Sequence, residues 1–464
     1  MPELLDIIAD GQTKPMTFRE ALELGKHRQN AGDLSGAADI YQQVHAADPG
    51  QVDALHLLGV ISHQLGEHDL AAGLITAALA IQPDFADAQS NLGVVYFDQG
   101  RMDEAAVCYQ RAIEINPELA DPHINMGALH HRLGQLDEAV GRYRSALAIN
   151  PNQAMAMASV GGILFEQQKF DEAERYLKQA ADQDAIYECG PVSFLGDDFN
   201  TACDPVNLDR LISTLPETTG TFPSGSGKGP VVVTSCDHGY FRRFGSALAL
   251  SVDQFAPGHD LHLHVINPEP SFDDEISALE RRLGNTMLTT TTESAPETDR
   301  LYFHVIRFVR LCQMIEASER DFLHLDTDSL VHGPLASTTG IDADVDLSIF
   351  TRFDRIPFQQ KVAIGSLFVR HTPMARRLMR RFGAYLAHCI HGNTLVWGLD
   401  QIAFYVVYRM MTFNGEEVSL ASLPKSLCDF DFADTSDVWA AKGNSKQNQI
   451  FEQESSRLLG LPLP

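Results

Sequence analysis

The chain has 464 residues, of which 44% are hydrophobic and 21% charged, as in globular proteins long enough for two or three domains. Its formal net charge of −27 argues against a nucleic-acid-binding face, because such faces gather lysine and arginine. No apolar run approaches the ~20 residues of a membrane-spanning helix, and Met1–Asp6 is acidic where a secretion signal is basic. Seven cysteines without a Cys-x-x-Cys pair predict reduced thiols, so we expect a cytoplasmic protein with neither a nucleic-acid partner nor a membrane span.

Proline and small residues recur with a period of 34 residues in the first part of the chain. The proline series is Pro49, Pro83, Pro117 and Pro151. The glycine and alanine series are Gly25, Gly59, Gly93, Gly127 and Gly161, and Ala37, Ala71, Ala105, Ala139 and Ala173. Small residues let two helices cross closely, and proline ends a helix before the next repeat begins. This period with these residues resembles the tetratricopeptide repeat, a pair of helices.

The pattern contains five repeats, and the last one departs from it. Their ranges are 18–51, 52–85, 86–119, 120–153 and 154–187. The fifth has Gln168 where the others have a turn glycine and Ala185 where they have proline, as terminal repeats often do because they cap the stack. The resemblance implies an all-α tetratricopeptide-repeat superhelix over residues 1–187, with residues 3–10 as a short cap at its other end.

The sixth position of each repeat is expected to face the concave groove of such a superhelix. Asn91 and Asn125 occupy it in the two most regular repeats. This pair resembles the asparagine ladder of the protein O-GlcNAc transferases, in which such side chains hold a peptide backbone. An amide both donates and accepts, which matches a peptide bond without reading its side chains. Two interpretations stay open: the asparagines bind a peptide, or they only brace adjacent repeats.

The periodicity is lost over residues 188–229, which we interpret as a linker. Residues 222–230 are rich in Gly, Ser and Pro, a composition typical of a flexible hinge. Gly227-Lys228 hints at a phosphate-binding loop, but Gly229 stands where serine or threonine belongs, and the segment precedes a strand instead of following one. We therefore reject a phosphate loop here.

Strand and helix patterns alternate through the last domain, residues 230–464. The expected strands are 231–235, 261–266, 287–292 and a run from residue 322. The expected helices are 240–254, 272–283 and 301–317. This alternation predicts an α/β sandwich with a largely parallel sheet, so the whole chain is expected to be α + α/β.

The strand that begins at Phe322 leads into two carboxylates, Asp326 and Asp328. Side chains alternate along a strand, so both carboxylates are expected on one side, where they repel each other unless a cation lies between them and an anionic ligand. Mg²⁺ or Mn²⁺ takes such oxygen ligands together with substrate phosphates. Ligand sites in open α/β sheets lie at the carboxyl ends of strands, which favours this pair over the same spacing elsewhere in the chain. The competing interpretation is two solvated carboxylates in a turn.

Segments on both sides of this pair resemble the GT-A nucleotide-diphospho-sugar transferases, most closely glycogenin and the bacterial lipopolysaccharide galactosyltransferases. The matching segments are Tyr302–Arg310, Leu323–Val331, Ala363–Val369, Gly398–Gln401 and Lys442–Lys446. The resemblance implies a GT-A type α/β fold and a metal-dependent glycosyltransferase. Such an enzyme moves a hexosyl or related sugar from a nucleotide-diphosphate donor to an acceptor, here expected to be a protein held in the repeat groove.

The resemblance also implies roles for single residues. Asp326 contacts the ribose or the donor sugar and, with Asp328, the divalent cation. Asp400, followed by Gln401, receives or orients the acceptor hydroxyl. The other candidates are Asp237 for the base, Gly365 for close approach to the sugar, Lys446 for the diphosphate, and Arg307 or Arg310 for orienting the Asp pair. A packing glycine and a helix-surface salt bridge are the alternatives for Gly365 and for the arginines.

One position departs from the family pattern. Family members have a histidine metal ligand three residues before the C-terminal glycine, and here that position is Ala440. The metal is then expected to keep an extra water, to bind more weakly or to be held differently. Ala440 also favours a rival hypothesis, a catalytically inactive transferase-like scaffold that binds protein partners through its repeats. A third hypothesis keeps the enzyme but gives it a glycan or lipid-linked acceptor.

Overall fold

The structure is a computed structural model, and it describes part of the chain. The described residues are 4–9, 12–187, 196–223, 229–295, 300–335, 344–352, 361–392, 394–395, 398–427, 436, 438–440 and 449–460. They divide into two compact units, Met1–Ile163 (unit 1) and Leu164–Pro464 (unit 2). Lys446 and residues 224–228 of the predicted hinge lie outside the described residues.

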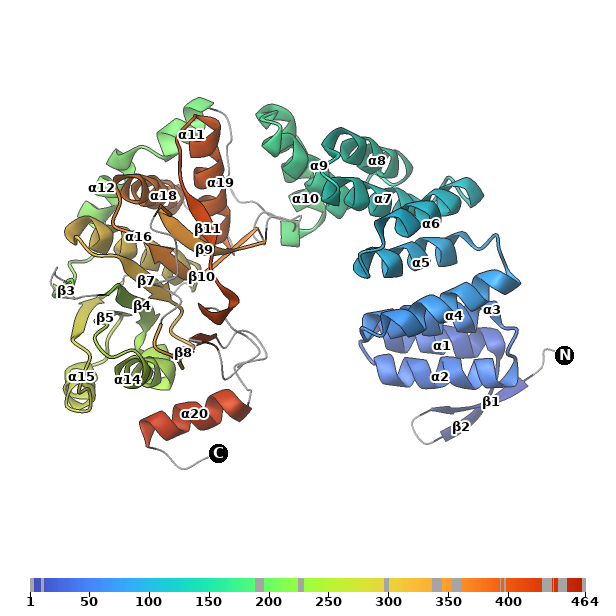
Figure 1. Cartoon of the computed structure of the whole chain (residues 1–464), viewed down its shortest axis with the longest axis horizontal. Coiled ribbons are helices and arrows are strands. Elements are labelled where there is room, and N and C mark those ends of the chain that lie inside the picture. Colours follow the sequence, from blue (N-terminus) through green and yellow to red (C-terminus); the bar gives the residue numbers. More distant parts are fainter. Residues whose placement is uncertain are drawn as a thin grey trace. The chain divides into compact units, whose positions relative to one another are not determined.

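Unit 1 consists of a β-hairpin followed by antiparallel helix pairs (Figure 1). The hairpin strands are β1 (Leu4–Ala9) and β2 (Gln12–Thr17). The helices are α1 (Phe18–Asn30), α2 (Leu34–Ala47), α3 (Val52–Gln64), α4 (His68–Ile81), α5 (Ala86–Asp98), α6 (Met102–Ile115), α7 (Ala120–Arg132), α8 (Leu136–Ile149) and α9 (Ala154–Glu166), which crosses into unit 2. Each predicted repeat therefore supplies two helices, as the 34-residue period requires.

The turn between the two helices of each repeat has a left-handed residue. Gly32, Gly66, Gly100 and Gly134 have φ values of +84°, +82°, +79° and +74°. Side chains rarely tolerate this conformation, which explains the glycine series. In the fifth repeat Gln168 takes the same region at φ +59°, so the geometry is kept without the glycine.

The hairpin caps the first helix pair. Ile7 of β1 is fully buried among core residues of α1 and α2, such as Leu22 and Val44. The Gln43 side chain accepts a hydrogen bond from the Ile8 N–H at 2.8 Å and donates one to its carbonyl at 3.0 Å. Residues 4–9 of the predicted cap over 3–10 are thus one strand of a hairpin, and the two hydrogen bonds to Gln43 attach this strand to α2.

Unit 2 contains the second helix of the fifth repeat and an α/β body (Figure 1). Its helices are α10 (Phe170–Gln183), α11 (Gly196–Ala202), α12 (Pro205–Thr214), α13 (His238–Tyr240), α14 (Ser246–Phe255), α15 (Phe272–Glu280), α16 (Arg300–Ala317), α18 (Pro373–His391), α19 (Leu399–Phe413) and α20 (Gln449–Leu459). Its strands are β3 (Thr219–Gly220), β4 (Val231–Asp237), β5 (Leu261–Ile266), β6 (Leu288–Glu293), β7 (Phe322–Leu325), β8 (Ser329–Val331), β9 (Leu347–Thr351), β10 (Val362–Val369), β11 (Leu420–Ser422) and β12 (Val438–Ala440).

The main sheet of unit 2 has the strand order β11-β9-β10-β7-β4-β5-β6-β3. Strands β4, β5, β6 and β7 run parallel, and β10 is antiparallel to both β7 and β9. The sheet is thus mixed and largely parallel. The chain leaves β4 towards β5 and β6 and then returns to β7 on the other side of β4. Ligands of open α/β sheets bind at such a reversal, beyond the carboxyl ends of the strands.

Unit 2 includes two segments that the sequence patterns do not assign to the α/β domain. α12 packs against α18, and β3 pairs with β6, so residues 205–220 of the predicted linker belong to the α/β body. The end of α9 and the start of α10 pack on α19. The rings of Phe165 and Phe170 lie 5.6 and 6.1 Å from that of Phe413.

Candidate functional site

The Asp326–Asp328 segment is a turn between β7 and β8, not the end of a strand. β7 stops at Leu325, and the Asp326 N–H donates to the Gly365 carbonyl of β10 at 2.8 Å. The strand alternation expected for the two carboxylates is therefore wrong, because residues 326–328 are not part of a strand. Gly365 does lie beside Asp326, and the contact between them is this backbone hydrogen bond.

Thr327 anchors this turn to the first parallel strand. Its hydroxyl lies 2.8 Å from that of Thr234 and donates to the Ser235 carbonyl at 3.2 Å. Both threonines are buried. Thr327 therefore fixes the turn beside Thr234 and Ser235 of β4, just past the end of β7.

Arg307 of α16 joins two of the predicted site residues. Its Nη1 donates to Asp326 at 2.7 Å and its Nη2 to Asp400 at 3.2 Å. All three side chains are at most 15% exposed. Burial disfavours the charged guanidinium, but the two carboxylates outweigh this effect and raise the pKa of Arg307 above its ordinary value. Arg307 therefore stays charged and holds Asp326 and Asp400 in one ion-paired group.

Tyr240 connects the remaining predicted carboxylates. The Tyr240 N–H donates to Asp237, the N-cap of α13, at 2.8 Å. The Tyr240 hydroxyl donates to Asp328 at 3.1 Å. Asp237 is exposed, whereas Asp328 is only 5% exposed. The carboxyl edge of β4 and β7 thus gathers four carboxylates, from Asp237, Asp326, Asp328 and Asp400.

Arg310 is not part of this group. It bonds Glu293 of β6, the Gln313 side chain at 2.7 Å and the Pro216 carbonyl at 2.9 Å. The arginine that contacts Asp326 is Arg307. Gln401 follows Asp400 in α19, and its N–H donates to the Asp400 carboxylate at 3.0 Å. Arg310 therefore connects α16 to β6, whereas Gln401 lies directly after Asp400 of the site.

The carboxylates fit a divalent cation only in part. Oxygens of Asp326 and Asp328 are the hard ligands that Mg²⁺ and Mn²⁺ take. Ala440 of β12 pairs with Ser329, directly after Asp328, so the position expected for a histidine ligand carries a methyl group at the site. Within the described ranges, no group of three His, Cys, Asp or Glu side chains forms a metal site. Asp326 and Asp328 would supply two carboxylate ligands to such a cation, and its other positions would be left to phosphate and water.

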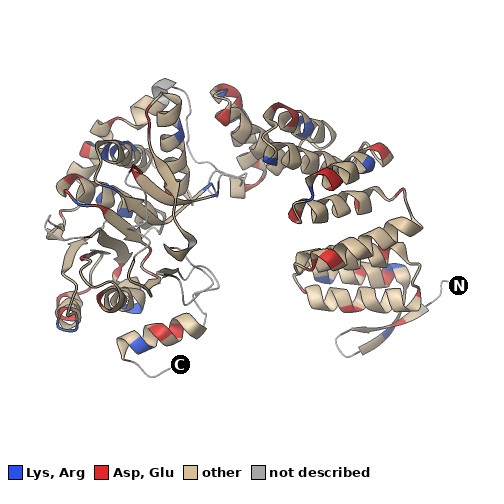
Figure 2. Ribbon diagram, in the orientation of Figure 1, with Lys and Arg blue, Asp and Glu red and all other residues tan. Residues whose placement is uncertain are grey.

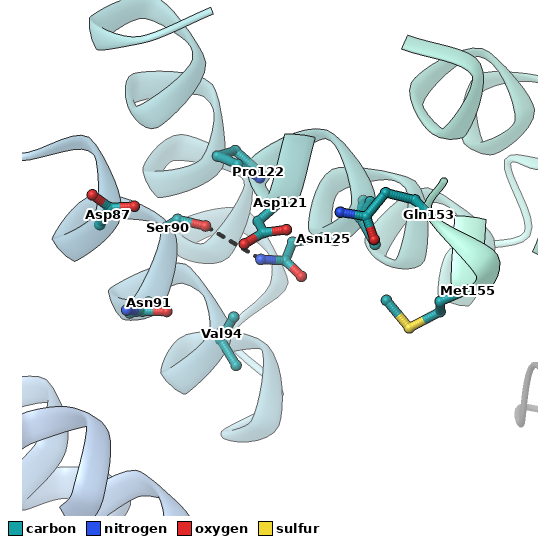
Figure 3. Close-up of a pocket in the computed structure, with 10 residues that line it drawn as sticks. Asp87, Ser90, Asn91, Val94, Asp121, Pro122, Asn125, Gln153 and Met155 are labelled. Carbon is teal, nitrogen blue, oxygen red and sulfur yellow. Dashed lines mark hydrogen bonds between the residues drawn. The ribbon is translucent and has the colours of Figure 1, made fainter. Parts of the chain in front are cut away.

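Unit 1 has a second candidate site, a cavity of about 360 Å³ on the face that carries the two asparagines (Figure 3). Its lining is Asp87, Ser90, Asn91, Val94, Asp121, Pro122, Ile124, Asn125, Gln153 and Met155. The lining spans three successive repeats. Two of the sixth-position residues, Asn91 and Asn125, belong to this lining.

Each asparagine also contacts the preceding repeat. The Asn91 amide lies 2.8 Å from Nε2 of His56, and the Asn125 amide donates to the Ser90 hydroxyl at 3.2 Å. Each bond uses the amide nitrogen and fixes the plane of the side chain. The Asn125 carbonyl oxygen points away from Ser90 (Figure 3). Bracing and peptide binding are therefore compatible, because bracing leaves the carbonyl group to accept from a peptide N–H.

Three residues of these sites were missed by the sequence analysis. Thr327 stands between the two aspartates, and its role depends on which strand lies beside the turn. Tyr240 is three residues after Asp237, a spacing typical of an N-cap and its partner, and that signal was available. His56 precedes Asn91 by one period plus one residue, a spacing that repeats for Ser90 and Asn125.

Family models match the repeat region of the chain. Models described as tetratricopeptide repeat match residues 22–84 and 118–185, and one described as TPR repeat matches residues 95–134. The chain carries tetratricopeptide repeats. Such repeats mediate binding of proteins or peptides, so this is the class of partner for the repeat region.

Solved structures of other tetratricopeptide-repeat proteins are similar to part of the chain. A crystal structure of MamA is 28% identical with a TM-score of 0.31, covering 35% of this chain and 95% of that one. Pseudomonas aeruginosa PilF is 21% identical with a TM-score of 0.37, covering 42% and 92%. YrrB, described as a TPR protein with an unusual peptide-binding site, is 20% identical with a TM-score of 0.29, covering 36% and 85%. None of the curated proteins compared with the chain matched it.

Aspartate and glutamate residues occur along the ribbons of both units (Figure 2). In the described part of the chain, no helix combines the length and the apolar character that a membrane crossing requires.

Proposed function

We propose that the chain is a glycosyltransferase that acts on a polypeptide. Unit 2 binds a nucleotide-diphosphate sugar at the carboxyl edge of β4 and β7, and the tetratricopeptide repeats hold the acceptor. The observation that carries the proposal is the ion-paired group of Arg307 with Asp326 and Asp400. It joins the predicted donor residue and the predicted acceptor residue at the reversal of strand order.

The roles of the residues follow from their surroundings. Asp237 is exposed beside the reversal and is open to a nucleotide base. Asp326 is held by Arg307 at the end of β7, and we assign it to the ribose or the donor sugar. Asp400 is held in place by Arg307, and we assign it to orient the acceptor hydroxyl by accepting its hydrogen bond.

A divalent cation would be held by Asp326 and Asp328. When bound, Mn²⁺ or Mg²⁺ neutralises the charge that builds on the departing diphosphate. The described residues of this site hold four carboxylates against one arginine. Their net negative charge repels a diphosphate, so we expect donor binding to require the cation. Tyr240 keeps Asp328 in place through its hydroxyl.

The alternative is a transferase-like scaffold that does not turn over. Ala440 beside Ser329 favours it, because a two-carboxylate site binds metal more weakly than one completed by histidine. The enzyme and the scaffold hypotheses assume the same fold and the same peptide groove. Only measurements of donor binding and of turnover distinguish the two hypotheses.

Calorimetry with a panel of nucleotide-diphosphate sugars, with and without Mn²⁺, tests the proposal. We expect one donor to bind only with Mn²⁺, and Asp328→Asn to abolish that binding. Asp274→Asn is the control, because Asp274 lies exposed in the first turn of α15. Sugar transfer to a protein acceptor then establishes turnover. If no donor binds with Mn²⁺, or if Asp328→Asn binds like the wild type, the scaffold is the better description.

A further inference from the structure

The cavity of unit 1 combines exposed carboxylates with apolar side chains. Asp87 and Asp121 line it, and both are exposed. Val94, Ile124 and Met155 line the same cavity as the two asparagines. A ligand in this cavity therefore meets negative charge, amide groups and aliphatic surface together.

The carboxylates recur at one position of the repeat. Asp53, Asp87 and Asp121 are each the second residue of repeats two, three and four. Among the described residues, neither the Asp87 nor the Asp121 carboxylate accepts a hydrogen bond or joins an ion pair. The first and fifth repeats have Arg19 and Met155 at this position, so the acidic run belongs to the middle of the array.

We propose that this cavity receives a lysine or arginine side chain from an extended polypeptide, and that the groove thereby selects basic segments. The inference rests on the peptide-binding part of the proposed function and adds the chemistry of the peptide. The methylene stem packs on Val94, Ile124 and Met155, while the charged head lies at Asp87 and Asp121. Long basic side chains bury their stems and keep their heads at polar groups in this way.

The asparagines and the aspartates recognise different parts of the bound peptide. Their amide nitrogens are fixed on His56 and Ser90, which leaves the carbonyl groups to accept from the peptide backbone. Backbone recognition is blind to sequence, whereas the carboxylates read the charge of one side chain. The net charge of −27 also speeds the approach of a basic partner.

A carboxylate in the first turn of a helix has a structural effect as well. Asp87 and Asp121 lie in the first turns of α5 and α7, where negative charge stabilises the helix N-terminus. Asp103 and Asp171 occupy the first turns of α6 and α10, are exposed, and do not line the cavity. Asp103→Asn with Asp171→Asn is therefore a control that matches both the lost charge and the lost helix interaction.

The test uses the full chain and three synthetic peptides of equal length. They are extended Ser/Thr-rich peptides that carry lysine, glutamine or glutamate at the same spaced positions. Fluorescence anisotropy measures their dissociation constants. We expect the lysine peptide to bind most tightly, and Asp87→Asn with Asp121→Asn to weaken it roughly 2- to 30-fold, as expected for two exposed ion pairs. The glutamine peptide should bind both variants and the wild type alike.

The outcomes separate the inference from the proposed function. If lysine and glutamine peptides bind the wild type equally, or if the control pair weakens the lysine peptide as much as the cavity pair, selection of basic segments is wrong while the groove stands. If Asn91→Ala with Asn125→Ala leaves the binding of every peptide unchanged, or if no peptide binds, peptide binding in the groove fails and the inference fails with it. Donor binding by unit 2 is measured separately and does not depend on either result.

Discussion

The hydroxyl groups of Thr234 and Thr327 lie 2.8 Å apart, buried between β4 and the turn that follows β7. This contact joins two segments 93 residues apart in sequence. It places Asp326 and Asp328 at the reversal of strand order, where an open α/β sheet binds its ligand. The position of the carboxylates therefore depends on a residue that carries no charge.

Replacing this hydroxyl should cost stability without changing volume. Thr327→Val leaves the Thr234 hydroxyl without its partner, and a buried polar group left unsatisfied costs about 1–3 kcal/mol. Thr327→Ser keeps the hydroxyl and is the control. Urea unfolding of both variants measures the difference, and a Thr327→Val protein as stable as Thr327→Ser would show that the hydroxyl does not hold the turn.

Removing the charge of Arg307 should destabilise unit 2 strongly. Arg307→Gln leaves the mostly buried carboxylates of Asp326 and Asp400 without their cation, and breaking a buried pair in this way costs about 3 kcal/mol or more. Arg242→Gln is the control, because Arg242 is paired with Glu275 at the surface and its loss should change the free energy of unfolding much less. Equal effects of the two substitutions in urea unfolding would contradict a structural role for the Arg307 group.

The repeats were predictable because their constraint is local and recurs. A left-handed turn and a close helix crossing each require a small residue at a fixed position, so the glycine and alanine series mark both. Gln168 shows the limit of this rule, since the turn keeps its conformation without glycine. The predicted asparagine position also follows from the repeat, because each repeat places its sixth residue on the same face.

The site of unit 2 was predictable only in part. The sequence marks Asp326 and Asp328, but the end of β7 is set by its pairing with β10, which no local pattern contains. Arg307 and Arg310 are three residues apart on one helix and look equivalent in the sequence. Glu293 of β6 pairs with Arg310, so tertiary packing decides which of the two arginines contacts Asp326. The sequence does indicate a short helix over residues 206–215, close to α12, but not the packing of this helix against α18.

Acid should weaken unit 1 through His56. Burial lowers the pKa of His56 below 6.5, an effect that Lys26 supports and that the carboxylates of Asp87 and Asp53 oppose. The unfolded chain therefore takes up the proton first as the pH falls below about 6.5, and the free energy of unfolding decreases in that range. A protonated His56 also loses the Nε2 lone pair that the Asn91 amide approaches.

His56→Gln isolates this effect, because glutamine does not titrate and still offers an oxygen to Asn91. Thermal unfolding at pH 7.5 and at pH 5.5 compares the two proteins (both pH values chosen about one unit from the histidine pKa). We expect the variant to lose less stability than the wild type on acidification. Burial also lowers the pKa of His123, but His123 is present in both proteins and cancels in the comparison. Parallel loss in both would exclude His56 as the titrating group.

A pair of glycine substitutions in unit 1 should have opposite signs. A Cβ at Gly93 of α5 would lie 2.5 Å from Cε1 of Tyr109, a ring only 2% exposed in the core of its repeat. Gly93→Ala should therefore overpack the helix crossing and destabilise unit 1 by about 1–3 kcal/mol. Gly141 of α8 is exposed, and a Cβ there meets no atom within 4 Å. Gly141→Ala should stabilise unit 1 by about 0.5–1 kcal/mol, because alanine has the higher helix propensity.

Urea unfolding of the full chain measures both glycine variants on the same transition of unit 1. A rescue variant tests the cause: Gly93→Ala combined with Tyr109→Leu removes the ring that the new methyl group meets. If steric overlap is the reason, adding Gly93→Ala to the Tyr109→Leu background should cost much less than adding it to the wild type. A Gly93→Ala cost that is the same in both backgrounds would mean that the glycine is required by the backbone and not by the crossing with α6.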